Sequence, residues 1–264
     1  MMNPRQEKIV QYLSEEGYGK IEVFAEKFEV SNETIRRDLL ALEQEAYINR
    51  VRGGARYDNL RAKEKKYEVR TQRNFREKRA IAKLAAEYIS DGDTIAINTG
   101  TSTLELAKEI VNRNYLTVIT NSVDVASLIV ENDLNKVYLP GGLLRNSGRG
   151  ISGEMCCEFI SHFQVDKAIL SIGGISSKCG ITEYHVEESA VLRKMIEISN
   201  KVMVLGDYSK FNEIALNKIC DYRQVDYLFT DWKTPAKEIL ECKKAGVNVG
   251  VAERNADVEK RRKN

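Results

Sequence analysis

The chain has 264 residues, of which 42% are hydrophobic and 30% charged, and its formal net charge is only +2. This length suits one small domain and one larger domain, each with its own core. No apolar run approaches the roughly 20 residues of a membrane-spanning helix, and the chain opens on a charged amphipathic helix instead of a signal peptide. We therefore expect no contact with a membrane.

The cysteines and histidines do not form a metal-binding pattern. The five cysteines are Cys156, Cys157, Cys179, Cys220 and Cys242, and the two histidines are isolated. An odd number of cysteines without ligand spacing is typical of free thiols in a reducing cytoplasm, so we predict no metal and a cytoplasmic location. The adjacent Cys156 and Cys157 could be redox-active, although small buried hydrophobic residues are the favoured interpretation.

Residues 1–57 predict three short amphipathic helices and a hairpin that together close a small core. The apolar residues of the first two helices are Ile9, Val10, Leu13, Ile21, Phe24, Ala25 and Phe28. In the third helix, which follows Ser31, the apolar residues Ile35, Leu39 and Leu42 recur at helical spacing. The hydroxyl of Ser31 can accept from a backbone N–H of the first turn, so Ser31 is a good N-cap.

The third helix and the basic hairpin 49–56 predict a DNA-binding surface. Arginine can grip guanine through two hydrogen bonds, and asparagine can do so with adenine. A capped helix followed by a basic wing is the arrangement that enters a major groove and holds the flanking phosphates. The alternative is an ordinary helical module with a solvated charged face. The candidate DNA-binding residues are Ser31, Asn32, Thr34, Arg36, Arg37, Arg50, Arg52, Gly53 and Gly54.

Positive charge gathers at the hairpin and in the segment after it. Residues 47–66 carry 7 Lys and Arg against 2 Asp and Glu, whereas residues 81–264 carry 23 against 25. Attraction to DNA phosphates should come from this region and weaken as salt rises. Because apolar residues are sparse in 58–80, we interpret that segment as a basic, mostly solvated linker that is helical in part. Residues 253–264 are expected to form a charged tail.

From residue 81 to residue 252, short apolar strands alternate with amphipathic helices. The predicted strands are 94–98, 116–120, 136–139, 167–172, 202–205, 227–230 and 247–251. The predicted helices are 77–89, 102–111, 123–130, 153–161, 187–199 and 235–245. This alternation predicts an α/β domain with a doubly wound, mostly parallel sheet. Ligands of such sheets bind at the carboxyl ends of the strands.

The loops after four predicted strands carry glycine, hydroxyl and charged residues, which suits a phosphate at a helix N-terminus. Lys210 would supply a cation, and Asp207 or Glu183 could accept from sugar hydroxyls. Each feature also has a purely structural explanation that involves no ligand, namely a capped helix, a tight turn or a solvated lysine. No P-loop and no dinucleotide-binding GxGxxG follow the first strand, so no cofactor is predicted. The candidate effector-binding residues are Asn98, Thr99, Gly100, Thr101, Ser102, Thr103, Gly141, Gly142, Gly173, Gly174, Asp207 and Lys210.

These motifs resemble the DeoR family of bacterial transcriptional regulators over most of the chain. In the first domain the matching segments are 5–9, 30–31, 34–39 and 50–55. In the second they are 91–95, 100–103, 120–122, 140–142, 173–175, 180–182 and 207–211. The resemblance implies a winged helix-turn-helix and an effector domain similar in fold to ribose-5-phosphate isomerase and glucosamine-6-phosphate deaminase. It further implies binding of a phosphorylated sugar or related metabolite without turnover.

Three positions depart from the family pattern. Glu29 and Ala46 stand where the family usually has glycine, and Asn98 stands where it often has aspartate. If position 29 or 46 needs a positive φ angle, a residue other than glycine costs about 1 kcal/mol there. Asn98 lacks the negative charge of aspartate but keeps its hydrogen-bonding capacity, so the identity of the effector stays open.

Three functions remain in view, and we predict the first. It is a metabolite-responsive repressor of a carbohydrate-metabolism operon, which binds double-stranded operator DNA as a homo-oligomer (dimer or tetramer). The second is a sugar-phosphate isomerase or deaminase with an accessory DNA-binding module, but no constellation of residues specifies a general acid and base. The third is an architectural DNA-binding protein indifferent to phosphosugars, against which the strand-end loops argue.

Overall fold

A computed structural model of the protein describes residues 3–44, 48–57, 67–145 and 148–254. Contacts within the chain separate it into two compact units, residues 1–65 and residues 66–264. Within the described ranges, every helix is too short or too polar to cross a bilayer. The predictions for Ala46, for 58–66 and for the tail from 255 onwards concern residues outside these ranges.

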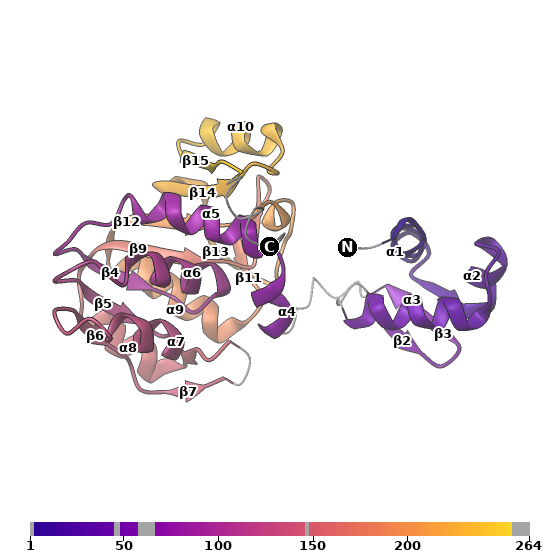
Figure 1. The fold of residues 1–264 in the computed structure, drawn as a ribbon, viewed down its shortest axis with the longest axis horizontal. Helices are drawn as coiled ribbons and strands as arrows, with labels where there is room; N and C mark the ends of the chain where they lie inside the picture. Colours follow the sequence, from indigo (N-terminus) through magenta and orange to yellow (C-terminus); the bar gives the residue numbers. More distant parts are fainter. Residues whose placement is uncertain (1–2, 45–47, 58–66, 146–147, 255–264) are drawn as a thin grey trace, which may run out of the picture. The chain divides into compact units, whose positions relative to one another are not determined.

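The first unit contains the three predicted helices and the predicted hairpin, and a short strand that was not predicted, β1, extends the hairpin to a small antiparallel sheet (Figure 1). Its helices are α1 (Pro4–Glu16), α2 (Ile21–Lys27) and α3 (Asn32–Gln44). Its strands are β1 (Tyr18–Lys20), β2 (Ile48–Val51) and β3 (Gly54–Tyr57), in the order β1-β3-β2. The predicted core is confirmed, because Ile35, Leu39 and Leu42 are at most 1% exposed and pack with Ile9, Leu13 and Phe24.

Polar contacts fix helix α3 at its start and against α1. The Ser31 hydroxyl accepts from the Thr34 backbone N–H at 3.2 Å, which confirms the predicted N-cap. Asp38 is 5% exposed and accepts from Arg5 Nε at 2.5 Å and from Gln6 Nε2 at 3.0 Å. Because the buried carboxylate is paired with the first turn of α1, α3 has a rigid support for its outward-facing residues.

The backbone explains two features of the turn and hairpin around α3. Glu29, between α2 and α3, has φ 53°, so this position does need the left-handed conformation that glycine adopts most easily. In the hairpin, Gly53 has φ 82°, and a Cβ on Gly54 would lie 2.3 Å from the carbonyl oxygen of Gly19. The two hairpin glycines therefore serve the turn and the packing of β3 on β1.

The second unit is built on a seven-stranded parallel sheet with the order β15-β14-β12-β9-β4-β5-β6. Its strands are β4 (Thr94–Ile97), β5 (Thr117–Thr120), β6 (Lys136–Tyr138), β9 (Val165–Ser171), β12 (Ser199–Leu205), β14 (Tyr227–Asp231) and β15 (Asn248–Ala252). All seven were predicted, and the doubly wound parallel fold is confirmed.

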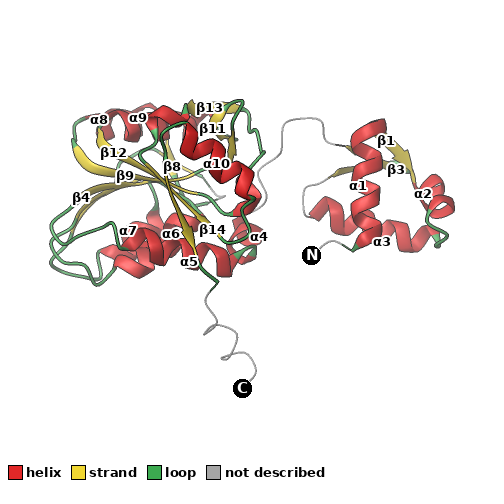
Figure 2. Cartoon of the chain, turned by 90° about the horizontal axis from the view of Figure 1, so that it is seen from above, coloured by secondary structure: helices red, strands yellow, loops and turns green. Residues whose placement is uncertain are grey.

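Helices cover both faces of this sheet (Figure 2). On one face lie α5 (Phe75–Ala86), α6 (Thr101–Ile110) and α7 (Val123–Ile129). On the other lie α8 (Glu154–Ser161), α9 (Val186–Glu197) and α10 (Ala236–Lys244). Each face buries its own apolar cluster, so the sheet is sandwiched between two cores, as its continuous apolar strands require.

Several short elements escaped the sequence analysis. A small antiparallel sheet contains β10 (Gly174–Ser176), β11 (Gly180–Glu183) and β13 (Asn217–Cys220), and a hairpin pairs β7 (Leu143–Leu144) with β8 (Ile151–Ser152). Two turns of 3-10 helix cover Tyr208–Lys210 and Tyr222–Gln224. Every residue of β10 and β11 is buried, so these strands lack the alternation of apolar and polar residues that reveals a strand.

The segment 58–80, interpreted from sequence as a basic linker, is helical over most of its described part. Helix α4 covers Tyr67–Gln72, and α5 begins at Phe75, ahead of the predicted start at residue 77. Glu77 and Lys78 are 5% and 4% exposed. Glu77 pairs with Lys233 at 2.6 Å, and Lys78 donates to main-chain carbonyls of the preceding turn. These charged residues can be buried because each has a partner.

The strand order reverses between β4 and β9, and the two strands are joined there by side-chain contacts. Asn98 Nδ2 donates to the Ser171 carbonyl at 2.8 Å, and Asn98 Oδ1 accepts from the Ser171 N–H at 2.8 Å. A Cβ on Gly100 would lie 2.3 Å from Ser171 Cβ. The crevice at such a reversal is where doubly wound sheets bind their ligands.

Substituting Gly100 should be costly, whereas substituting Gly141 should not. Gly141 has nothing within 4 Å of an added Cβ. We expect Gly100→Ala to lower the free energy of unfolding by about 2 kcal/mol through overpacking. Gly141→Ala should stay within about 0.5 kcal/mol of the parent. Urea unfolding followed by the fluorescence of Trp232, the single tryptophan, measures both. Equal stabilities of the two variants would contradict the close contact at Ser171.

The left-handed conformation of Glu29 leads to a second stability prediction. Glu29→Gly should leave the local stability of α1–α3 unchanged or raise it by up to about 1 kcal/mol, because relief of backbone strain offsets the entropy of the unfolded glycine. Lys8→Gly, in the middle of α1, should lower it by about 1 kcal/mol. Hydrogen exchange of α1–α3 amides in the full chain distinguishes the two. A similar loss for both variants would mean that position 29 carries no strain.

Candidate functional site

The outward side of α3 presents two arginines to solvent. The side chains of Arg36 and Arg37 are 60% and 82% exposed. Glu33 lies 3.4 Å from Arg36 Nη1 and 4.0 Å from Arg37 Nε, contacts that hold exposed side chains only weakly. Asn32 is exposed beside them, while the hydroxyls of Ser31 and Thr34 bond to each other in the cap. The predicted residues of α3 thus form two groups. Asn32, Arg36 and Arg37 face solvent, whereas Ser31 and Thr34 form the helix cap.

The hairpin adds cations next to α3. Arg50 contacts Glu43 of α3, with 3.7 Å between Nε and Oε2, and its backbone N–H donates to Glu43 Oε1 at 3.1 Å. Arg52 is exposed at the turn, and Arg56 lies over the Tyr18 ring with 6.0 Å to its centroid. Contacts between Glu43 and the hairpin therefore fix the wing on the helix that carries Arg36 and Arg37.

In the second unit, the N-terminus of α6 gathers unpaired hydrogen-bond donors at the crevice between β4 and β9. The first helical bond runs from Leu104 N–H to the Gly100 carbonyl, so the N–H groups of residues 101–103 lack an intrahelical partner. Thr101 and Ser102 are 6% and 3% exposed, and their hydroxyls bond to none of the described residues. Buried donors at the positive end of a helix are suited to an anion.

Three neighbouring polar residues are instead occupied by the loop itself. Thr99 Oγ1 donates to the Gly148 carbonyl at 2.7 Å, and Thr103 Oγ1 donates to the Asn98 carbonyl at 2.8 Å. Both bonds of the Asn98 side chain go to Ser171. Asn98, Thr99 and Thr103 thus shape the loop, and they leave Thr101 and Ser102 as its available hydroxyls.

Lys210 and Asp207 differ in what they leave available. The half-buried Lys210 amine lies 3.4 Å from the Gly173 carbonyl, a long contact that leaves it donors for an anion. Asp207 is 2% exposed, and its Oδ1 accepts from Asn74 Nδ2 at 2.8 Å, Ser209 N–H at 3.0 Å and Ser209 Oγ at 2.6 Å. Asp207 therefore holds the 207–210 turn in shape, and Lys210 is the residue of that turn suited to a ligand.

The four predicted glycines lie in two places. Gly173 stands beside Lys210, and Gly174 packs so closely that a Cβ would meet the Glu213 carbonyl at 2.3 Å. Gly141 and Gly142 lie in the loop before the β7–β8 hairpin, where a Cβ on Gly142 would be 2.7 Å from the Ser152 carbonyl. The close neighbours of Gly142 belong to β8 and α8, not to α6. The next loop, between β7 and β8, does reach Thr99 through Gly148 and Gly150.

Residues of α4 and α5 add positive charge that the sequence analysis did not assign to this region. Lys78 Nζ donates to the carbonyls of Arg70 and Arg73. Burial lowers the pKa of Lys78 to about 8; nearby Asp207 raises that pKa, and Lys210, Arg70 and Arg73 lower it. Lys78 therefore stands close to the 207–210 turn. The one available signal was the predicted helix 77–89, which contains Lys78 but gives no sign that this lysine is buried.

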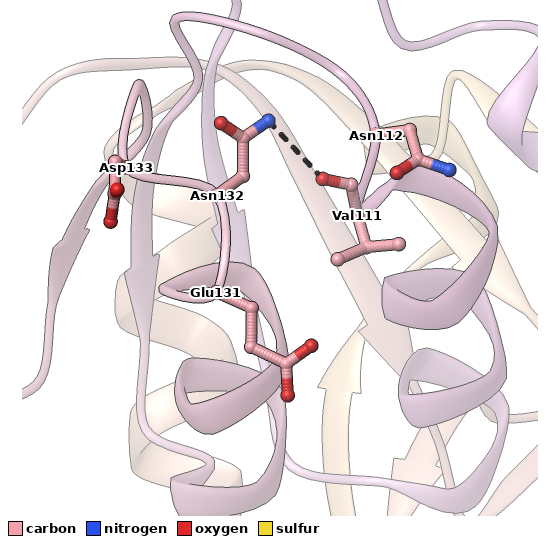
Figure 3. A pocket seen from close by; sticks show the side chains of 5 residues that line it. All are labelled: Val111, Asn112, Glu131, Asn132 and Asp133. Carbon is pink, nitrogen blue, oxygen red and sulfur yellow. Dashed lines mark hydrogen bonds between the residues drawn. The ribbon is translucent and has the colours of Figure 1, made fainter.

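A surface hollow elsewhere in this unit has the wrong charge for an anion. Val111, Asn112, Glu131, Asn132 and Asp133 line it at the C-terminal ends of α6 and α7, and Asn132 Nδ2 donates to the Val111 carbonyl at 3.4 Å (Figure 3). The two carboxylates and the negative helix ends repel a phosphate. The ends of parallel strands and of their returning helices lie at opposite edges, so this hollow is distinct from the crevice.

The cysteines are structural thiols. All five are free, and burial raises the pKa of Cys156 and of Cys220 to about 12. A thiol that stays protonated at neutral pH is a poor nucleophile, which supports the packing interpretation of Cys156 over a redox role. Among the described residues, no cluster of His, Cys, Asp and Glu is arranged to hold a metal ion.

Two family models match the chain. Residues 5–61 match the DeoR-like helix-turn-helix domain, and residues 73–232 match the DeoR C terminal sensor domain. The second match begins inside the α4–α5 region, in agreement with the place of α5 in the second unit.

Named relatives cover nearly the whole chain. The HTH-type transcriptional repressor CsqR of Escherichia coli is 35% identical over 89% of each chain. The glycerol-3-phosphate regulon repressor of Escherichia coli is 34% identical over 88% of this chain and 91% of its own. The HTH-type transcriptional repressor GlcR of Bacillus subtilis is 34% identical over 84% of this chain and 86% of its own.

Solved structures are more distant. A ribose-5-phosphate isomerase in complex with phospho-erythronic acid is 15% identical with a TM-score of 0.39, and 52% of this chain and 53% of that one are covered. The δ subunit of eIF2B from Chaetomium thermophilum is 15% identical with a TM-score of 0.43, and 61% and 58% are covered. The chain thus spans little more than half of these proteins.

Both domain matches and the three relatives agree with the capped, arginine-bearing helix of the first unit and the α/β architecture of the second. A helix-turn-helix domain binds DNA, and a sensor domain binds a small molecule. The protein belongs to the DeoR family of transcriptional regulators.

Proposed function

We propose that the protein is a repressor of a carbohydrate-metabolism operon and that a phosphorylated sugar, bound at the N-terminus of α6, releases it from operator DNA. The observation that carries this proposal lies at the crevice between β4 and β9: the hydroxyls of Thr101 and Ser102 bond to none of the described residues, and the N–H groups of residues 101–103 lack an intrahelical partner. A ligand that supplies acceptors there can bond to donors that the helix itself does not use.

A phosphate monoester matches these donors better than a neutral sugar does. Its oxygens accept several hydrogen bonds at once, and its charge is favoured by the helix end and by the Lys210 amine. Gly100 packs on Ser171, and two residues further along the chain the Gly173 carbonyl contacts Lys210, so the end of β9 links the two anion-binding features. The sugar hydroxyls would then face the remaining strand-end loops.

The DNA contacts are proposed for the outward residues of α3 and the wing. Asn32, Arg36 and Arg37 would read or grip the major groove, and Arg50 and Arg52 would hold flanking phosphates. Ser31, Thr34, Gly53 and Gly54 support these residues through the cap and the hairpin turn. Operator half-sites call for two copies of the reading helix, so we infer a homo-oligomer, a dimer or tetramer, that acts in the cytoplasm.

The contacts of Asp207 argue against the isomerase alternative. Asp207 would be the natural general base beside Lys210, but three donors already occupy one of its carboxylate oxygens. A general base needs a lone pair within reach of the substrate proton. The named relatives of the protein are transcriptional repressors, which also supports a sensing role for the second unit.

Replacing Arg37 should weaken DNA binding alone. Arg37→Ala should lower affinity for DNA from upstream of the protein's own gene about 10-fold, because a groove contact is worth roughly 1–3 kcal/mol. Fluorescence anisotropy with excess random DNA measures this affinity. Arg113→Ala, an exposed arginine in the sensor domain, is the matched control and should stay within about 2-fold. Equal affinities of Arg37→Ala and the parent would remove Arg37 from the interface.

Replacing Lys210 should weaken the effector response and leave effector-free DNA binding intact. A panel of glycerol 3-phosphate, glucose 6-phosphate and fructose 6-phosphate, with the unphosphorylated sugars and inorganic phosphate as references, is titrated against the DNA complex. Lys210→Ala should shift the midpoint for the active compound about 10-fold or more, since a charged hydrogen bond is lost. Lys237→Ala, an exposed lysine of α10, should not shift it. An unchanged midpoint for Lys210→Ala would exclude Lys210 from the site.

A further inference from the structure

Helix α4 contacts the loops on one side of the α6 N-terminus. Tyr67 Oη donates to Asp124 Oδ2 at 3.2 Å, next to the ion pair between Asp124 and Arg149 at 2.8 Å. Gly148, whose carbonyl accepts from Thr99, lies so close to α4 that a Cβ on it would be 3.5 Å from the Arg70 guanidinium. Helix α4 therefore contacts the start of α7 and the β7–β8 loop, whose Gly148 carbonyl in turn accepts from Thr99.

The other end of α4 is attached to the turn that carries Lys210. Asn74 joins α4 to α5 in the left-handed conformation, with φ 53°. Its Nδ2 donates to Asp207 Oδ1 at 2.8 Å and to Ser209 Oγ at 3.1 Å, and its Oδ1 accepts from Tyr208 Oη at 3.3 Å. Both polar atoms of the Asn74 side chain thus bond to residues 207–209, directly before Lys210.

Lys78 fastens the end of α4 to α5. Its amine donates to the carbonyls of Arg70 and Arg73, the latter at 2.9 Å, and so satisfies acceptors that a helix end leaves open. Lys78 is also close enough to Asp207 and Lys210 for both to alter its pKa. The junction of α4 and α5 therefore lies next to the charges of the 207–210 turn.

We propose that α4 transmits the occupancy of the anion site to the DNA-binding domain, and that Asn74 is the contact that couples them. This inference rests on the proposed function. An anion that draws Lys210 from the Gly173 carbonyl displaces the 207–210 turn, and the three bonds of Asn74 carry that displacement to α4. The chain runs from α4 back to the DNA-binding domain, whose affinity for DNA changes only if the two positions of α4 favour it differently.

The test replaces Asn74 by glycine in the full-length protein. Asn74→Gly keeps the left-handed backbone without strain and deletes all three side-chain bonds. Tyr115→Gly is the matched control: Tyr115 has φ 60°, is 65% exposed and precedes β5 at the opposite edge of the sheet. For each protein, calorimetry measures affinity for the active compound of the panel, and anisotropy measures DNA affinity with and without saturating compound.

We expect the compound to change DNA affinity of the parent and of Tyr115→Gly about 10-fold, within the usual range of allosteric coupling. In Asn74→Gly that change should fall below about 2-fold, while affinity for the compound stays within about 3-fold of the parent. Asn74→Gly with a full response would overturn the coupling role. Loss of compound binding in Asn74→Gly would also overturn it, because Asn74 would then act in the site itself.

A measurement on the parent protein keeps the inference open to refutation if Asn74→Gly does not fold. The active compound should change hydrogen exchange of the amides in residues 67–73, and unchanged exchange there would overturn the inference. The proposed function fails differently: the parent protein would bind no member of the panel. A parent that binds a compound without any change at α4 would thus refute the coupling and leave the effector site standing.

Discussion

The close approach of β4 and β9 is the constraint on which the sensor domain depends. The Asn98 side chain spans the two strands as a donor and an acceptor to the backbone of Ser171, and Gly100 leaves room for the Ser171 side chain. An ionised aspartate at position 98 could only accept, so it would leave the Ser171 carbonyl without its donor. Asn98, which stands where the family often has aspartate, thus completes the junction and also keeps a negative charge away from the anion site proposed at the start of α6.

That junction decides where donors remain available. Because Thr99 and Thr103 are bonded into the loop, the hydroxyls that bond to none of the described residues are those of Thr101 and Ser102, in the first turn of α6. The cations stand on other elements, with Lys210 after β12 and Lys78 on α5. Burying Lys78 would cost several kcal/mol without partners, and the carbonyls at the end of α4 supply them. The proposed anion site and the junction of α4 and α5 are therefore held by the same few contacts.

Local patterns in the sequence were sufficient for the framework. The spacing of Ile35, Leu39 and Leu42 and the cap at Ser31 depend on neighbours within a few turns, and buried parallel strands appear as continuous apolar runs. The contact between the α4–α5 junction and the 207–210 turn could not be foreseen, since Asn74 and Asp207 are separated by 133 positions in sequence. The loop at Gly141 was predicted to lie at the crevice because it follows a strand. That placement stays a prediction: β6 is the edge strand, and the residues after Gly142 form the β7–β8 hairpin, whose turn at Gly148 bonds to Thr99.

The strength of the α4 attachment suits a regulator better than a rigid joint would. Neutral hydrogen bonds contribute about 1 kcal/mol each, and those to a carboxylate somewhat more. Asn74 therefore holds the 207–210 turn by a few kcal/mol, comparable with the roughly 1–3 kcal/mol of typical coupling between sites. A much stronger attachment would keep α4 in one position whatever the ligand. A much weaker one would let the turn move without α4, so the junction at Asn74 lies in the range where a bound phosphate can change the state of the connector.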